Sequence, residues 1–337
     1  MSDGDGNLLR YVGLRSATAL VLANIIGAGI FTSTGFQAAA LGHPGYIFLL
    51  WIVGGILALC GALCFAELGA AMPRAGAEYV YLRETYGNAF AFMSAFVSLL
   101  AGFSAPIASA LKSFIAYAAH FVPALADDPK LFGWISVSDI IAIALCWILI
   151  LIHTARVRGG LGFNDLITLF KVCGIVGIIL SAAAFGSGTA GNLTTVSASF
   201  HELSWSGRGA AFGTSLIFVM FCYSGWNASA YMAGEMKDAQ RVLPRSLLFG
   251  TGLVVLLYLG MNAVYLYGAD VDTLAGKVEV GQVAAEALFG GVGVTLVTIV
   301  LCVSIFASAS AMTIVGPRVY YAFGKDFEPL RFLARVN

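Results

Sequence analysis

Charged side chains are scarce in this sequence. Only 11% of the 337 residues are charged, whereas 59% are apolar and the mean hydropathy is +0.89. A soluble domain usually carries about 25% charged residues. Basic and acidic residues number 18 each, so the net charge of zero indicates no basic surface for nucleic acid. The composition predicts an integral membrane protein that has the lipid bilayer as its surroundings and no nucleic-acid partner.

Paired cysteines and clusters of metal ligands are also lacking. The six cysteines lie singly in apolar segments, without the spacing of a zinc site or a disulfide framework, and we interpret them as small core residues. They are Cys60, Cys64, Cys146, Cys173, Cys222 and Cys302. We also find no nucleophile and base paired at membrane depth and no motif typical of a channel filter. We therefore expect no metal, no cofactor and no enzymatic activity.

Long apolar runs are abundant, and eight of them reach the length of about 20 residues that a bilayer requires. The first run is too long for the apolar core of a signal peptide, about 7 to 15 residues, so we keep it as a span. The third, at about 33 residues or about 50 Å of helix, must tilt steeply or protrude. The expected spans are 16–40, 45–71, 89–121, 136–154, 163–186, 210–235, 246–268 and 289–316.

The basic residues between the spans predict the orientation. With the N-terminus in the cytosol, about thirteen Lys and Arg residues fall inside and about three fall outside. One missed or extra span would scramble this alternation, so it also supports the span count. We expect a multi-pass protein of the cell membrane, a single transmembrane domain over residues 1–337, with both termini cytoplasmic.

Small and polar residues interrupt the first and sixth spans. The interruptions read IIGAGIF at 25–31 and FCYSGWN at 221–227. Unwound backbone at membrane depth leaves polar groups without partners, which is tolerated where they line a cavity. Gly-Ala-Gly alone is typical of close helix packing. Interruptions at corresponding positions of two halves indicate the substrate site of a transporter.

Two lysines lie within the spans. Lys112 is late in the third span, where its stem can reach the outer headgroups, and we assign it no function. Lys171 lies about 12 Å into the fifth span, so we expect it to face a polar interior with a partner, with snorkelling along its own helix as the alternative. Glu67 and Glu235 lie near cytosolic helix ends, where capping or pairing with arginines is the favoured interpretation and proton binding a secondary one.

Four stretches of the chain resemble the amino acid permeases of the amino acid-polyamine-organocation superfamily, closest to its L-type and bacterial proton-coupled branches. They read NIIGAGIF at 24–31, FAELGAAMPRAGAEYVYLRETYG at 65–87, YSGWN at 223–227 and GPRVYYA at 316–322. The resemblance runs from about Leu14 to the end. It implies an all-α, leucine-transporter-like fold of five spans repeated in inverted orientation, with helices 1 and 6 broken. The first repeat would cover about 14–186 and an incomplete second repeat about 210–337.

The resemblance also implies a substrate site at the two breaks. The free amides at the start of the second half-helix would hold the substrate carboxylate, and carbonyls of both broken helices would hold its ammonium. The dipole ends of the half-helices favour the same assignment. Phe221 matches an aromatic gate, and Asn227 matches a polar residue at the second break. The expected substrate-binding residues are Ile25, Gly27, Ala28, Gly29, Ile30, Phe221, Cys222, Ser224 and Asn227.

Lys171 matches a lysine that, in sodium-independent relatives, places its ammonium where sodium-coupled relatives hold sodium. We therefore expect Lys171 to contact first-helix carbonyls near Gly27 and polar groups of the eighth helix, Ser304 or Ser308. A lysine there could also couple proton movement to the transport cycle.

The resulting prediction is a sodium-independent secondary transporter of free α-amino acids that works by alternating access, as a proton symporter or an exchanger. The alternative is an amino acid sensor or partner subunit without transport. The implied fold needs ten spans and the chain has eight, so it is either a fragment of a longer permease or a shortened protein completed by a partner subunit or lacking transport. The sequence does not predict which amino acid side chain is selected. By their expected depth in the membrane alone, the candidates for the side-chain pocket are Gly102, Ser104 and Cys302.

Overall fold

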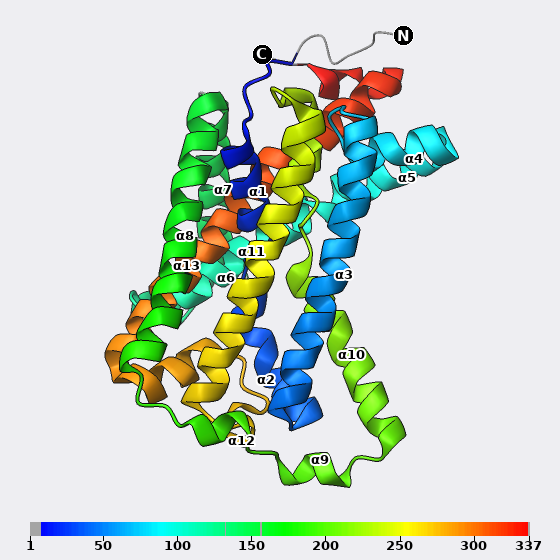
Figure 1. Ribbon diagram of the computed structural model, residues 1–337. Helices are drawn as coiled ribbons and strands as arrows, with labels where there is room; N and C mark the ends of the chain where they lie inside the picture. The colour runs from blue at the N-terminus through cyan, green and yellow to red at the C-terminus, as the bar shows by residue number, and fades with distance from the viewer. Residues whose placement is uncertain (1–7, 132, 156, 336–337) are drawn as a thin grey trace.

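The computed structural model describes residues 8–131, 133–155 and 157–335. Within these ranges it has eight helical segments that are long and apolar enough to cross a membrane, which confirms the expected all-α membrane fold and the number of spans. The first and last described residues lie at the same end of the bundle, which we call the terminus end (Figure 1). The segments are Leu14–Leu41, Pro44–Ala71, Asn88–Ala118, Val137–Thr154, Gly159–Phe185, Trp205–Glu235, Ala239–Gly268 and Val280–Asp326.

The first span is two helices, α1 (Leu14–Ile25) and α2 (Gly29–Leu41). Gly42 ends α2 in the left-handed region, at φ 56°, a conformation that glycine adopts without steric cost. Helix α3 (Pro44–Ala71) follows directly, with proline in its first turn, where a missing N–H costs nothing.

The third span crosses the bundle obliquely (Figure 1), as its length predicted. After α4 (Glu78–Tyr86), it comprises α5 (Asn88–Val97), a π-helical turn η1 (Ser98–Gly102) and α6 (Ser104–Ala118). The π turn bends a helix that the sequence suggested to be continuous.

Helices α7 (Val137–Ala155) and α8 (Val157–Phe185) form the next pair. They follow a 3-10 turn, η2 (Pro123–Leu125), and a two-residue antiparallel pairing of β1 (Lys130–Leu131) with β2 (Ile135–Ser136), the one departure from the all-α expectation in the described part of the chain. Lys112 Nζ lies 2.8 Å from Asp139 in the first turn of α7. Lys112 therefore forms an ion pair within the protein, whereas the sequence suggested only that its stem reaches the outer lipid headgroups.

The second half begins with two short elements, η3 (Ala190–Leu193) and α9 (Ala198–Glu202). The sixth span comprises α10 (Trp205–Tyr223) and a 3-10 segment, η4 (Ala228–Glu235). Then follow α11 (Ala239–Gly268), α12 (Val271–Leu274), α13 (Val280–Asp326) and η5 (Glu328–Ala334). The expected seventh and eighth spans, 246–268 and 289–316, were too short, because polar turns extend both helices beyond their apolar parts. Gly290, at φ 66°, kinks α13.

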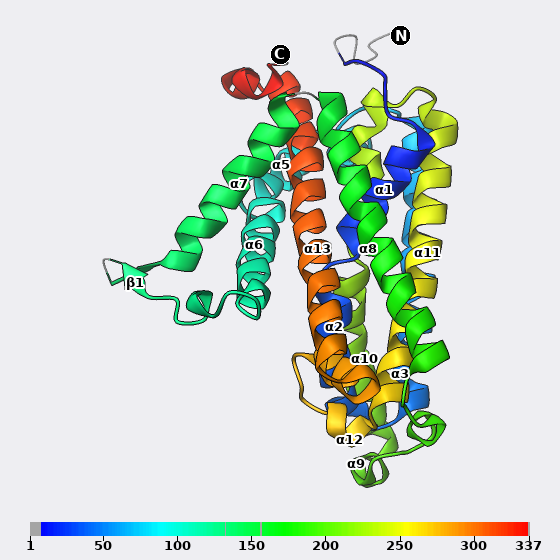
Figure 2. The same ribbon diagram turned by 90° about the vertical axis from the view of Figure 1, so that its left-hand side faces the viewer.

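The broken first span lies inside the bundle, between α8, α11 and α13 (Figure 2). The interpretation of the cysteines as core residues was wrong for half of them. Cys222 and Cys302 are buried, but Cys60, Cys64 and Cys173 are exposed on the outer surfaces of their helices. The outer surface of a membrane protein contacts lipid, which is as apolar as the protein core. Hydrophobicity alone therefore does not distinguish a lipid-facing residue from a core residue.

Candidate functional site

The first break exposes the start of α2. Helix α1 ends at Ile25, Ile26 is extended, and α2 begins at Gly29. The backbone N–H groups from Gly27 through Ile30 have no hydrogen-bond acceptor in the described chain. Such unpaired donors, at the positive end of the helix dipole, form an anion-binding site.

The carbonyl end of α1 is held from two other helices. Lys171 Nζ of α8 donates to the carbonyls of Ala23 and Ile26 at 3.0 and 2.5 Å. Ser308 Oγ of α13 lies 2.7 and 3.0 Å from the same two carbonyls and donates its one proton to either. Lys171 is fully buried. A cation thus lies at the negative end of the α1 dipole, where positive charge is favoured. Lys171 does not snorkel along its own helix.

Ser304, the other expected partner of Lys171, lies elsewhere. Its hydroxyl donates to the carbonyl of Val300, four residues earlier in α13, at 2.7 Å. A serine in a helix commonly satisfies its hydroxyl in this way. Of the two serines, only Ser308 reaches the first break.

The second break is closed by local hydrogen bonds. Helix α10 ends at Tyr223, and the carbonyl of Phe221 accepts both the N–H and the hydroxyl of Ser224, at 3.0 and 2.7 Å. The side chain of Phe221 is 77% exposed. Gly225 follows at φ +93°, and a Cβ there would lie 3.1 Å from the backbone of Asn24 in α1, so the two breaks are in direct contact.

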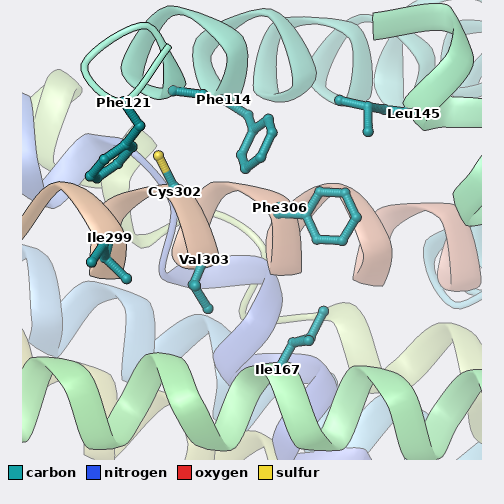
Figure 3. Close-up of a pocket in the computed structure, with 9 residues that line it drawn as sticks. Phe114, Phe121, Leu145, Ile167, Ile299, Cys302, Val303 and Phe306 are labelled. Atoms are coloured by element: carbon teal, nitrogen blue, oxygen red, sulfur yellow. The ribbon is translucent and has the colours of Figure 1, made fainter. Parts of the chain in front are cut away.

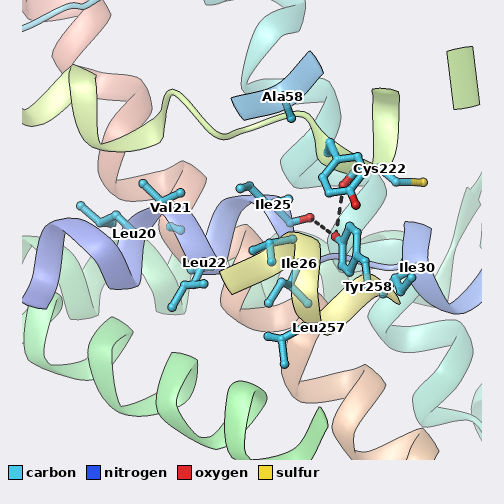
Figure 4. Packing of buried hydrophobic residues seen from close by; sticks show 14 of the residues in the cluster. Leu20, Val21, Leu22, Ile25, Ile26, Ile30, Ala58, Cys222, Leu257 and Tyr258 are labelled. Carbon is cyan, nitrogen blue, oxygen red and sulfur yellow. Dashed lines mark hydrogen bonds between the residues drawn. The ribbon is translucent and has the colours of Figure 1, made fainter. Parts of the chain in front are cut away.

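Tyr258 of α11 connects the two breaks. Its hydroxyl lies 2.9 Å from the carbonyl of Ile25 and 3.1 Å from the carbonyl of Cys222 (Figure 4). A phenol carries one proton, so it can donate fully to one of these carbonyls at a time. The other keeps acceptor capacity for a second donor.

Packing fixes the position of Tyr258. Its ring contacts Trp51 edge-on, with centroids 5.2 Å apart, and tilts against Tyr223 at 5.1 Å. The Trp51 indole donates to Gln37 Oε1 at 2.7 Å, which ties this aromatic cluster to α2. Tyr258 was not among the site residues predicted from the sequence. The available signal was a tyrosine at membrane depth, whose hydroxyl needs a buried partner.

A cavity of about 480 Å³ opens between the two breaks, a size typical of small-ligand sites. It brings together Ile25, Gly27, Ala28, Gly29, Phe221, Cys222, Ser224 and Ser308 of the predicted residues. The remaining lining residues are Asn24, Ala101, Ala105, Pro106, Ser109, Ala110, Ser113, Ile305 and Met312. Apart from Asn24 of α1, these residues come from the third and eighth spans, which contribute them rather than the candidates chosen by depth, Gly102, Ser104 and Cys302.

Two predicted substrate residues do not line this cavity. The side chain of Ile30 is fully buried in the core. Asn227 Nδ2 donates to the hydroxyl of Tyr231 at 3.1 Å, toward the terminus end. The position of a residue along a span predicts how deep it lies in the membrane but not which way its side chain points once the helix unwinds. The 3.6-residue periodicity that would give this direction ends at the break.

A second cavity, of about 380 Å³, lies on the other side of α13. Apolar side chains of α6, α7, α8 and α13 line it, with the thiol of Cys302 among them (Figure 3). It offers no donor or acceptor that could recognise an amino acid backbone, so we do not assign it to the substrate.

The terminus end of the bundle is closed by an ion pair. Arg318 of α13 contacts both carboxylate oxygens of Glu235, at 2.8 and 3.0 Å, and the hydroxyl of Tyr11 donates to the same carboxylate at 2.7 Å. The backbone N–H groups of Tyr11 and Val12 donate to the carbonyl of Glu235, both at 2.9 Å. The expected pairing of Glu235 with an arginine is confirmed. Glu67 is exposed and forms no ion pair within the described residues, so its expected pairing is not observed.

These features define a class: a multi-spanning membrane protein with a cavity between two interrupted helices. The amino acid permease family model matches residues 12–337, and the chain belongs to that family.

Individual relatives are transporters by name. The chain is 30% identical over 329 residues to the serine/threonine exchanger SteT of Bacillus subtilis, which covers 96% of this chain and 70% of that protein. It is 28% identical to the human Asc-type amino acid transporter 1 (84% of this chain, 53% of that protein) and 28% identical to the mouse b(0,+)-type amino acid transporter 1 (98% and 66%). The chain thus spans about half to 70% of the length of these relatives.

Proposed function

We propose that this chain forms the substrate site of a secondary active transporter of free α-amino acids, which works by alternating access. The observation that carries the proposal is the set of unpaired N–H groups at Gly27, Ala28 and Gly29, facing a cavity that also meets the carbonyl ends of α1 and α10. An α-amino acid carries a carboxylate and an ammonium on one carbon, so it matches donors and acceptors placed this close together.

Each part of the substrate has a proposed partner. The amides of Gly27, Ala28 and Gly29 bind its carboxylate. Its ammonium binds to the carbonyls of Ile25, Cys222, Phe221 and Ser224. The Tyr258 hydroxyl then donates to the carbonyl of Ile25 or of Cys222, whichever does not contact the ammonium. The exposed ring of Phe221 covers the bound substrate. Asn227 supports the second break through Tyr231 instead of contacting substrate.

We further propose that the substrates are neutral amino acids and that the mode is exchange. None of the seventeen residues that line the cavity carries a charge. A charged substrate side chain would therefore be desolvated without a partner, which is costly. The name of the bacterial relative, a serine/threonine exchanger, supports both points.

Lys171 makes sodium unnecessary in this proposal. Its ammonium, with Ser308, occupies the carbonyl end of α1, where a bound cation would otherwise stabilise the unwound backbone. We propose that the terminus end is cytosolic, in accordance with the excess of basic residues there. We also propose that 14–186 and 210–337 are inverted repeats, the second incomplete, in a protein of the cell membrane.

Binding and flux test this proposal separately. The chain is purified in nanodiscs and its thermal unfolding is followed with each of the twenty amino acids. A ligand at about 100 times its Kd should stabilise the protein by about 2.7 kcal/mol. Counterflow of the best ligand in proteoliposomes, with and without sodium, then measures exchange. Binding without flux would support a sensor or a partner subunit, and no stabilisation by any amino acid would refute the site.

A further inference from the structure

A buried carboxyl group lies at the terminus end, outside the cavity. Glu78 is the first residue of α4, and the turn before it packs closely against η4 and α13. Gly76, at φ +105°, donates its N–H to the carbonyl of Tyr231, and a Cβ there would meet Ala322 of α13 at 2.7 Å. Ala77 is fully buried at φ 43°, a conformation that costs energy for a residue other than glycine. The turn is thus held in a strained conformation that directs Glu78 inward.

One side chain donates a hydrogen bond to the Glu78 carboxyl. Its Oε1 accepts from the hydroxyl of Tyr231 at 2.7 Å, while its Oε2 is buried and has no partner. No ion pair of Glu78 exists among the described residues. An ionised carboxylate in such surroundings is unfavourable, because an oxygen without a donor loses its hydration without replacement.

Three arginines at this end pair with carboxylates other than Glu78. Arg318 pairs with Glu235, Arg83 with Asp326 and Glu84, and Arg74 with Glu84. The titratable side chains that interact directly with Glu78 within the described residues are Tyr231 of η4 and Tyr81 of α4. Burial is the main cause that raises the pKa of Glu78, and hydrogen bonds from Tyr231 and from the backbone of Glu78 itself partly oppose it.

The same hydrogen bonds extend to the substrate region. Tyr231 donates to Glu78 and accepts from Asn227, the last residue of the second break. A change at Glu78 therefore alters the contact between α4 and η4, and through η4 the second break.

We propose that Glu78 is a proton-binding site that is occupied while α4 and η4 are in contact and releases its proton when this contact opens. The proposal rests on the proposed function in one respect: opening of the contact is taken as the inward-opening step. In an exchanger, the proton released when the contact opens is taken up again from the same side when the contact closes. No net proton transport is therefore required.

The sign of the pH effect follows from linkage. The raised pKa belongs to the closed state, and an exposed glutamate has its ordinary value. The closed contact therefore loses stability as pH rises from the ordinary glutamate pKa through the raised one. Acidic pH favours the closed contact, and alkaline pH favours opening.

Infrared spectroscopy of the protein in nanodiscs tests the site directly. We expect a protonated-carboxyl band that persists above the ordinary glutamate pKa and is absent in Glu78→Gln. Glu84→Gln is the matched control on the same helix: Glu84 is exposed, and Arg83 holds its pKa below the usual value, so the band should remain. Tyr231→Phe should move the titration to higher pH. An unchanged band in Glu78→Gln overturns the proposal, as does a band that titrates at the ordinary value.

Hydrogen exchange of residues 228–236 tests the link to opening. Glutamine mimics the protonated carboxyl, so at alkaline pH this segment should exchange more slowly in Glu78→Gln than in the native protein, and equally at acidic pH. Comparison at matched pH removes the intrinsic pH dependence of exchange. Equal exchange at every pH overturns the link. An intact titration in a protein without amino acid flux would instead refute the transport function and leave the proton site standing.

Discussion

The two breaks are held in different ways. The first is fixed by side chains from three other helices: Lys171 of α8, Ser308 of α13 and Tyr258 of α11. The backbone of the second is closed by Ser224 beside it and, among the described residues outside this span, receives a hydrogen bond from the Tyr258 hydroxyl; the side chains of Cys222 and Tyr223 also bond outward, to Ser33 and to the carbonyl of Trp51. Long-range contacts make the first break a fixed platform. A locally closed break can change conformation without disturbing the rest of the bundle, so we expect the second to move.

The largest effect should come from Lys171→Ala. The variant removes the only cation at the carbonyl end of α1 within the described residues, and its charge-assisted hydrogen bonds, each worth about 1.5 to 3 kcal/mol. We expect uptake to fall at least about tenfold, which corresponds to about 1.4 kcal/mol. Lys112→Ala, which breaks an ion pair at the opposite end, is the control and should leave uptake unchanged. Unchanged rate and pH dependence in Lys171→Ala would eliminate this role.

Tyr258→Phe should have the next largest effect. It removes the hydroxyl that contacts both breaks and leaves one of two buried carbonyls without its donor, at about 1 to 3 kcal/mol. We expect the Kd for substrate to rise about tenfold in a binding assay, since the two carbonyls are no longer held together. In Tyr223→Phe, which loses a bond to the carbonyl of Trp51 only, we expect lower stability but an unchanged Kd. Equal Kd values in both variants would show that the bridge is structural.

Gly225→Ala tests the direct contact between the breaks. Alanine at φ +93° is strained by about 1 to 2 kcal/mol, and its Cβ presses on Asn24. The melting temperature should fall, and binding should weaken with it. Gly213→Ala in α10 is the matched control, because a Cβ there meets nothing within 4 Å; alanine should stabilise that helix by up to about 1 kcal/mol. A neutral result at Gly225 would mean that the breaks separate readily.

The smallest expected effect is the difference in substrate affinity or stability between alanine variants of the two serines of α13. Ser308→Ala removes a donor to the carbonyls of Ala23 and Ile26 and should cost about 1 kcal/mol in substrate affinity or stability. Ser304→Ala removes only a bond within its own helix and should be nearly neutral. Thermal unfolding with and without ligand measures both. A larger loss for Ser304 would contradict the assignment of Ser308 as the partner of Lys171 at the first break.

Much of the site could be predicted because it consists of backbone. The unpaired N–H groups at Gly27 to Gly29 follow from a break that the sequence itself shows, whichever side chains surround it. Lys171 was also predictable, since an ammonium at that depth requires a partner. The inward direction of Glu78 and the bridge made by Tyr258 were not, because both depend on contacts between residues more than 150 positions apart.

The sequence by itself determined the membrane class, the eight spans and the places where two of them unwind, because hydrophobic length and helix-breaking residues act locally. The tertiary structure decided which groups meet at those places: that Ser308 reaches the break and Ser304 does not, that Asn227 turns toward Tyr231, and that Cys60 faces outward while Cys222 lines the cavity. The physical reason is that lipid and protein interior are equally apolar, so composition does not choose between them. Only packing and the pairing of polar groups do.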